Sequence, residues 1–249
     1  MPSAVRPDGL CRIQAELGEQ ALCKTCREFP RLTHDYGSFL EYGLELSCPE
    51  AARRILCSPA TLPPVHPLTG EEEYDSAAMT LLLRTRQQAI ALLAGDAPPK
   101  VSAGSLLEYG ARVQRMLDGS EEAPVPDAQD AYFAEITEFF ANLEPLTDRW
   151  QPLLCQARLS PLPGEALPLL RYFVGRYWLQ AIADDDLLSR IKLSVVAAVL
   201  ISALPGDFTA NAVLFSREIE NSAENIDLLL DLLAYSPRFS CRAVARLLL

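Results

Sequence analysis

Thiolates bind soft metal ions, and five of the seven cysteines of this 249-residue chain fall within its first 57 residues. Their spacing is C-x11-C-x2-C-x21-C-x8-C. A zinc ribbon needs a second C-x-x-C pair, which is absent here, whereas an iron–sulfur cluster accepts less regular spacing and takes about four thiolates. The metal-binding candidates are Cys11, Cys26 and Cys48, with Cys23 as a further candidate.

Other readings of these residues stay open. Free cysteines are among the most often buried residues, so simple burial also explains the group. Cys23 and Cys26 could instead form a redox pair. His34 lies between Cys26 and Cys48 and is either a fourth metal ligand or a surface residue. Neither histidine of the chain lies in an H-E-x-x-H motif, so the sequence predicts no histidine-rich metal site.

A carboxylate or another anion beside the cysteines could be held by Arg27, Arg31, Arg53 and Arg54, or these arginines could form internal ion pairs. Downstream, the polar stretch SREIENSAEN (216–225) either lines a pocket or is a solvated helix end. No Gly-rich phosphate loop and no G-x-S-x-G motif is present, so local motifs do not support a Rossmann-type enzyme. The cofactor-binding candidates are Arg27, Arg31, Glu220 and Asn221.

The composition is that of a folded acidic protein. The net charge is −11 and 49% of the residues are hydrophobic, which argues against disorder and against a nucleic-acid partner. The longest apolar run, 194–206, is too short to span a bilayer, so no membrane partner is predicted. The chain opens with no secretory signal pattern, so we expect a cytoplasmic protein with reduced thiols.

Apolar residues recur at helical spacing over most of the chain, which predicts a mainly α fold. We expect a small irregular cysteine-rich module at 1–58, containing one short strand or half of a hairpin at 38–47 and a loop at 28–37. Ser47 or Cys48 is expected to be the N-cap residue of a helix whose first residue is Pro49. The proline-rich connection 58–70 leads to a helical bundle at 59–249. Its helices are predicted at 71–94, 102–118, 127–143, 145–158, 165–183, 186–204, 208–219, 222–235 and 238–249.

The residue order in several segments indicates a protein family. DGLCRIQAELGEQALCKTCREFPR (8–31) and LSCPEAARRIL (46–56), with RYFVGRYWLQAI (171–182) and SREIENSAENIDLLLDLL (216–233), resemble the flagellin lysine-N-methylase family. The resemblance implies transfer of methyl groups from S-adenosylmethionine to lysines of flagellin or another lysine-bearing protein. It also implies an iron–sulfur cluster, or zinc, held by Cys11, Cys26 and Cys48.

The chain departs from the family at its start. Family members carry a further run of cysteines before the D-G-L-C motif, and this chain begins too late to contain it. We therefore expect a truncated or divergent member, in which both the methyl donor and the metal centre are open to loss. The alternative hypothesis is a non-catalytic helical interaction protein with structural cysteines.

Overall fold

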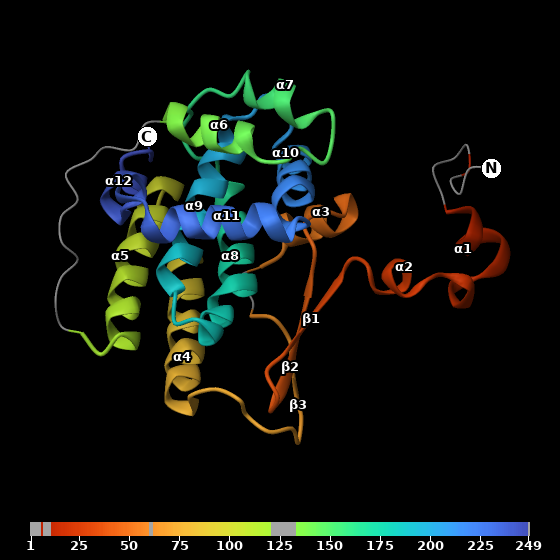
Figure 1. Ribbon diagram of the computed structural model, residues 1–249, viewed down its shortest axis with the longest axis horizontal. Coiled ribbons are helices and arrows are strands. Elements are labelled where there is room, and N and C mark those ends of the chain that lie inside the picture. The colour runs from red at the N-terminus through yellow and green to blue at the C-terminus, as the bar shows by residue number, and fades with distance from the viewer. Residues whose placement is uncertain (1–5, 7–10, 60–61, 121–132, 249) are drawn as a thin grey trace.

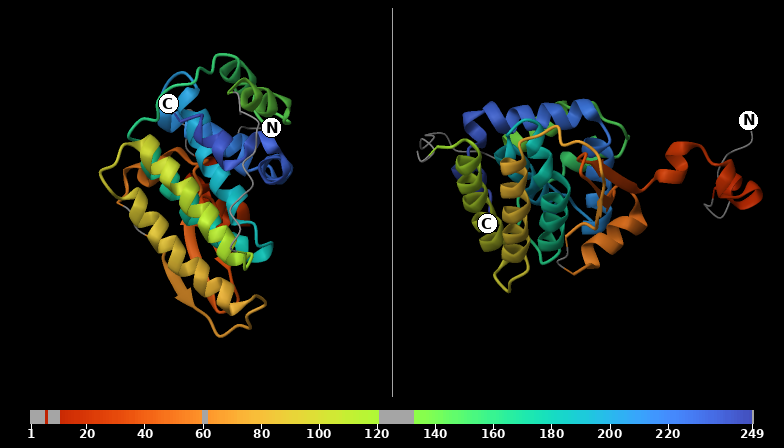
Figure 2. Two further views of the ribbon diagram at one scale, coloured as in Figure 1. Left: turned by 90° about the vertical axis from the view of Figure 1, so that its left-hand side faces the viewer. Right: turned by 90° about the horizontal axis from the view of Figure 1, so that it is seen from below.

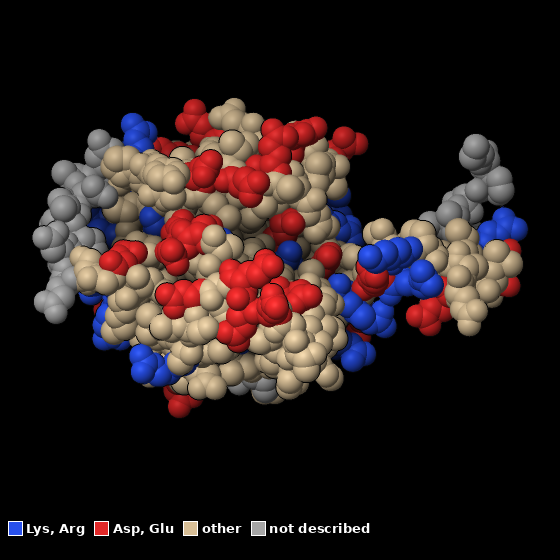
Figure 3. Space-filling view, turned by 60° about the horizontal axis from the view of Figure 1, so that its bottom comes forward, with Lys and Arg blue, Asp and Glu red and all other residues tan. Residues whose placement is uncertain are grey.

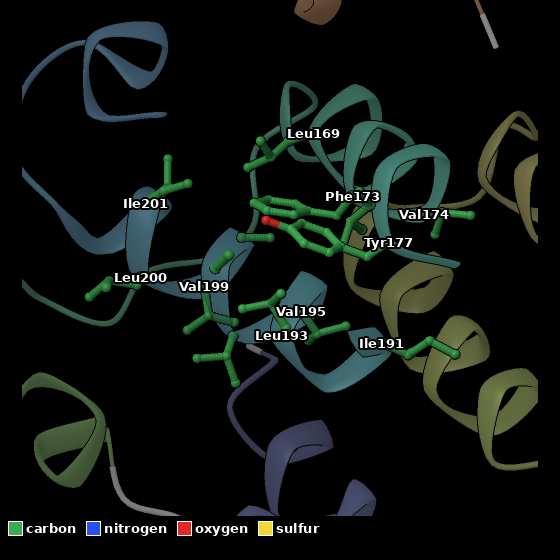
Figure 4. Close-up of a cluster of buried hydrophobic side chains, with 14 of the residues drawn as sticks. Leu169, Phe173, Val174, Tyr177, Ile191, Leu193, Val195, Val199, Leu200 and Ile201 are labelled. Atoms are coloured by element: carbon green, nitrogen blue, oxygen red, sulfur yellow. The ribbon is translucent and has the colours of Figure 1, made fainter. Parts of the chain in front are cut away.

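Helix α9 (Leu187–Ala203) is buried along almost its whole length, as its apolar sequence predicts. It packs against α5 (Pro99–Leu117), α8 (Ala166–Tyr177) and α11 (Ala223–Tyr235). Figure 4 shows Phe173 and Tyr177 of α8 pointing towards α9. The carboxylate of Asp186 caps α9 by accepting a hydrogen bond from the Ser189 N–H.

The computed structural model describes residue 6 and residues 11–59, 62–120 and 133–248 (Figure 1). The predicted mainly α fold with a small N-terminal sheet is confirmed. No helix in these ranges has the length and apolar character that crossing a membrane requires. The remaining helical elements are α1 (Arg12–Leu17), η1 (Glu19–Ala21), α2 (Lys24–Glu28), α3 (Pro49–Cys57), α4 (Ser76–Leu93), α6 (Phe133–Asn142), α7 (Trp150–Leu154), η2 (Trp178–Ala183), α10 (Phe208–Phe215), the π-helical turn η3 (Ser216–Glu220), η4 (Pro237–Phe239) and α12 (Cys241–Ala245).

A glycine allows α5 to approach α9 closely. A Cβ atom on Gly110 would lie 2.2 Å from Cδ1 of Ile191, which is closer than carbon atoms can pack. Helix interiors normally disfavour glycine by about 1 kcal/mol relative to alanine. The close helix contact is the physical reason for a glycine at this position.

The sheet has three antiparallel strands in the order β1 (Arg31–Asp35), β2 (Phe39–Leu44) and β3 (Val65–Pro67). His34 lies opposite Glu41 in the register. The predicted strand at 38–47 is confirmed by β2. The predicted loop at 28–37 is wrong, because residues 31–35 of this segment pair with β2 as strand β1. Strand β3 lies inside the proline-rich connection.

Local sequence signals predicted the start of α3 correctly, but not the starts of α4 and α5. Cys48 is the N-cap residue of α3 and Pro49 its first residue, as predicted. Helix α4 begins later than predicted, at Ser76, where the Asp75 carboxylate accepts hydrogen bonds from two N–H groups. Helix α5 begins earlier than predicted, at Pro99, and α7 and α12 are shorter than their predicted helices. The start of the helix predicted at 127–143 lies outside the described residues.

Helices α1 and α2 stand away from the helical body as an arm (Figures 1 and 2). Neither helix buries a residue, and Leu17 is 71% exposed. The segment that follows the arm does pack on the body, because α3 contacts α8 and α10. The division of the chain into units at 1–58 and 59–249 stays a prediction.

Candidate functional site

A cavity of about 590 Å³ lies between the sheet, residues 58–59 and 62–64, and α8. Its volume is in the range of sites that bind small molecules. Two glycines, Gly43 of β2 and Gly175 of α8, are part of its lining. The apolar part of the wall includes Leu32, Leu44, Ile55, Leu62, Pro63 and Pro64.

His34 brings a titratable group to this cavity. Strand alternation turns Leu32 and His34 to the same face of β1, and both line the cavity. The Nε2 atom of His34 is buried and has no hydrogen-bond partner among the described residues. Burial lowers the pKa of His34, and the positive charge of Arg176 lowers it further. The imidazole is therefore neutral at pH 7, and its buried Nε2 makes no hydrogen bond to a described residue.

A buried ion pair ties the sheet to α4 behind the cavity. Arg86 donates to both carboxylate oxygens of Glu41, at 2.6 and 2.9 Å, and both side chains are 2% exposed. Arg86 also reaches the carbonyl of Gly175, at 3.4 Å. This pair neutralises Glu41, which is the one acidic residue among the described residues of the cavity lining.

A second buried network holds α8 to η3. The Glu220 carboxylate accepts hydrogen bonds from the Tyr177 hydroxyl at 2.9 Å and the Tyr172 hydroxyl at 3.1 Å, and Arg176 Nε lies 3.3 Å from it. Burial and the Glu220 charge raise the pKa of both tyrosines. Burial opposes the charge on Arg176, but Glu220, Tyr172 and Tyr177 together outweigh burial and raise the pKa of Arg176. Tyr172 and Arg176 line the cavity, so this network fixes one wall.

The structure places the predicted cofactor-binding residues in different locations. Arg31 lines the cavity and Glu220 lies in the network behind it. Arg27 lies on α2 in the arm, and Asn221 is exposed after η3. The sequence analysis missed Arg86, Arg171 and Arg176. Two arginines five residues apart in the otherwise apolar stretch RYFVGRY were the signal that could have found the last two.

The predicted metal ligands do not assemble in the described part of the chain. No group of three or more His, Cys, Asp or Glu side chains there could hold a metal ion. Cys23 and Cys26 are hydrogen bonded to each other on the exposed arm, whereas Cys48 lies at the start of α3. In this arrangement the cysteines do not fit an iron–sulfur cluster or a zinc site.

A metal centre built from Cys11, Cys26 and Cys48 stays a prediction, and the metal content of the purified protein tests it directly. Elemental analysis of the purified protein would detect bound iron or zinc. If metal is bound in stoichiometric amount, Cys26→Ser and Cys48→Ser should each lower its content. A folded wild-type protein free of both metals would remove the prediction.

Cys23 should react faster with alkylating agents than Cys26. A hydrogen bond from the Cys26 N–H and another from the Cys26 thiol lower the pKa of Cys23, and the bond to Cys23 raises the pKa of Cys26. The thiolate is the reactive form. After brief iodoacetamide treatment, peptide mass spectrometry should find several-fold more label on Cys23. Replacing Cys26 with alanine should slow that labelling, and equal labelling of the two wild-type cysteines would contradict the geometry.

The lowered pKa of His34 predicts a pH-dependent stability. Below its unfolded value of about 6.5, the unfolded chain binds a proton that the folded protein resists. The folded protein therefore loses stability as the pH falls from about 6.5 towards the pKa that His34 has in the folded state. Urea unfolding of wild type and His34→Gln at pH 7.5 and pH 5 tests it. The variant should lose less stability between the two pH values, and an equal loss would refute the assignment.

Over 52 residues, the chain is 48% identical to curated proteins concerned with flagella or lysine methylation. One is the flagellar biosynthetic protein FliU of Salmonella muenchen, of which the match covers 31%. The others are the lysine-N-methylases of Salmonella typhimurium (strain LT2) and Salmonella choleraesuis (strain SC-B67), of which it covers 13% each. The matched stretch is 21% of this chain. The predicted resemblance is thus confirmed over that stretch.

No family model matches the chain. No solved structure matches it either.

Proposed function

We propose that this protein is an S-adenosylmethionine-dependent N-methyltransferase of protein lysines, with flagellin as its substrate. The observation that carries the proposal is the 48% identity over 52 residues to proteins named lysine-N-methylase. Because the match covers 13% of those proteins, activity, donor and substrate are all parts of the proposal.

The cavity is the proposed reaction site. Its volume and its mixture of apolar walls with a few polar groups suit a small-molecule donor, and the buried Nε2 of His34 lacks a hydrogen bond that a bound polar group could supply. When bound, S-adenosylmethionine would supply an electrophilic methyl group on sulfur. No step is assigned to an iron–sulfur cluster, because the described cysteines do not fit one.

The chain's own residues would prepare the lysine. A lysine nitrogen attacks only as the neutral amine, and apolar walls such as Leu32 and Pro63 disfavour the charged ammonium form. His34 is neutral at pH 7, so its Nε2 can take the ammonium proton. The neutral amine would then offer its lone pair to the methyl carbon of the donor, and the electron pair of the broken carbon–sulfur bond would stay on sulfur. Arg86 and Arg176 hold Glu41 and Glu220, so neither carboxylate is free to trap the ammonium.

Mass spectrometry of flagellin after incubation with the protein and S-adenosylmethionine tests the proposal. We expect lysines to gain the mass of one methyl group. His34→Gln should slow the transfer on the order of 100-fold, which is typical of losing a general base. The matched control is His66→Gln, since His66 is the other histidine and is exposed on β3. No methyl gain with wild type would overturn the function, and full activity of His34→Gln would overturn the role of His34.

A further inference from the structure

Two arginines of the cavity have no acidic partner in the part of the chain that the structure describes. Arg31 and Arg171 both line it, and neither forms an ion pair with a carboxylate among the described residues. Their hydrogen bonds go to backbone carbonyls: Arg31 donates to Arg27, at 2.7 Å, and Arg171 to Leu93 and Ser58, at 3.0 and 3.5 Å. The other arginine in the lining, Arg176, is paired with Glu220.

The electrostatics of the cavity are therefore unbalanced. Glu41 is the one acidic residue in the described part of the lining and is neutralised by Arg86, so the charges of Arg31 and Arg171 remain uncompensated there. Burial lowers the pKa of Arg171, which is the sign of a cation that loses hydration without gaining a counter-ion. An anion bound beside Arg171 would supply that counter-ion through charged hydrogen bonds.

The charge of the whole protein limits the kind of anion. A net charge of −11 repels large polyanions such as nucleic acids, whereas a small anion feels mainly the local field. Figure 3 shows Lys and Arg side chains gathered where the arm joins the body, beside a face of the body rich in Asp and Glu. The prolines and leucines of the wall offer an apolar surface to the rest of the ligand.

We propose that the cavity binds a small organic anion, with its carboxylate or phosphate on Arg171, Arg31 adding attraction, and its apolar or aromatic body against Leu32, Leu62 and Pro63. This inference stands on the cavity alone and does not require methyl transfer, so either proposal can fail without the other.

Two fluorescent probes of similar shape separate the anionic group from the apolar body. 8-Anilinonaphthalene-1-sulfonate carries a negative charge, and N-phenyl-1-naphthylamine lacks it. We expect both to bind the folded wild-type protein. Arg171→Gln should weaken binding of the anionic probe about tenfold or more, and binding of the neutral probe less than about twofold. Arg31→Gln should act in the same direction with a smaller effect. Arg158→Gln is the matched control, because Arg158 also donates to backbone carbonyls but is not part of the lining.

Filling the cavity locates the binding. Gly175→Leu and Gly43→Val each place bulk in the lining from opposite walls, and both should weaken the two probes alike. Gly175→Ala is the control, since a Cβ atom there lies 3.6 Å from Pro63 Cγ, an ordinary contact. Thermal melting confirms that each variant is folded. Unchanged probe binding in both filled variants, or an Arg171→Gln protein that binds the anionic probe like wild type, overturns the proposal.

Competition identifies the anionic group. Benzoate and phenyl phosphate have the same ring and differ in the charged group, and benzyl alcohol is their neutral counterpart. Displacement of the anionic probe by benzoate alone indicates a carboxylate ligand, and by phenyl phosphate alone a phosphate ligand. Displacement by both leaves the shared chemistry as proposed. If neither displaces the probe more effectively than benzyl alcohol, the proposal is wrong.

Discussion

Arg86→Ala should lower the free energy of unfolding by about 3–5 kcal/mol. The substitution leaves the Glu41 carboxylate in a site where the side chain is 2% exposed, with neither of its two charged hydrogen bonds. A buried charge without a partner costs far more than the ion pair itself contributes. Urea unfolding followed by circular dichroism measures the change.

Two further variants separate this effect from general damage. The double variant Glu41→Leu with Arg86→Met removes both charges at similar volume and should be more stable than Arg86→Ala alone. Arg53→Ala breaks an exposed pair with Glu50 on α3 and should leave the unfolding midpoint almost unchanged. If Arg86→Ala unfolds at the same urea concentration as Arg53→Ala, Glu41 and Arg86 are not buried together.

Glu220→Ala should be comparably destabilising, by about 3–5 kcal/mol. It leaves Arg176, whose side chain is 12% exposed, without its carboxylate, and it removes the acceptor of the Tyr172 and Tyr177 hydroxyls. Tyr177→Phe, which removes one of these hydrogen bonds, should cost about 1–2 kcal/mol. Thermal and urea unfolding give both numbers.

The matched control for Glu220→Ala is Glu224→Ala. Glu224 is exposed at the start of α11, and its loss should change the stability by less than about 0.5 kcal/mol. Equal stability of the two alanine variants would contradict the buried network that joins η3 to α8.

Strong local signals predicted part of the fold. The order Cys48, Pro49, Glu50 combines an N-cap position, a proline and an acidic first turn, and α3 begins there. The helix predicted at 186–204 is confirmed by α9, which is buried along almost its whole length. Strand β1 was missed because its partner β2, not its own residues, makes it a strand. The start of α4 was missed because the chain before it packs on the turn at Gly37. That glycine has φ +73°, and a Cβ atom there would lie 2.1 Å from the Glu71 carbonyl oxygen.

The candidate site could be predicted only in fragments. Arg31 was identified as an anion-binding candidate, and Arg53 and Arg54 form the internal ion pairs that were the alternative for such arginines. His34 was considered as a metal ligand, whereas the structure places it in the cavity. Arg171 is far from Arg31 in the sequence, and only the packing of α8 against the sheet brings both into one lining. No local sequence pattern predicts that Arg31 and Arg171 line the same cavity.

The most direct test of the account compares methyl transfer to flagellin by wild type, Gly175→Ala and Gly175→Leu, measured by mass spectrometry with S-adenosylmethionine as donor. If the cavity is the reaction site, wild type and Gly175→Ala transfer methyl groups at similar rates, and the bulk of leucine in the lining abolishes transfer. A folded Gly175→Leu protein that methylates lysines as fast as wild type would contradict the account, because the chemistry would then occur elsewhere.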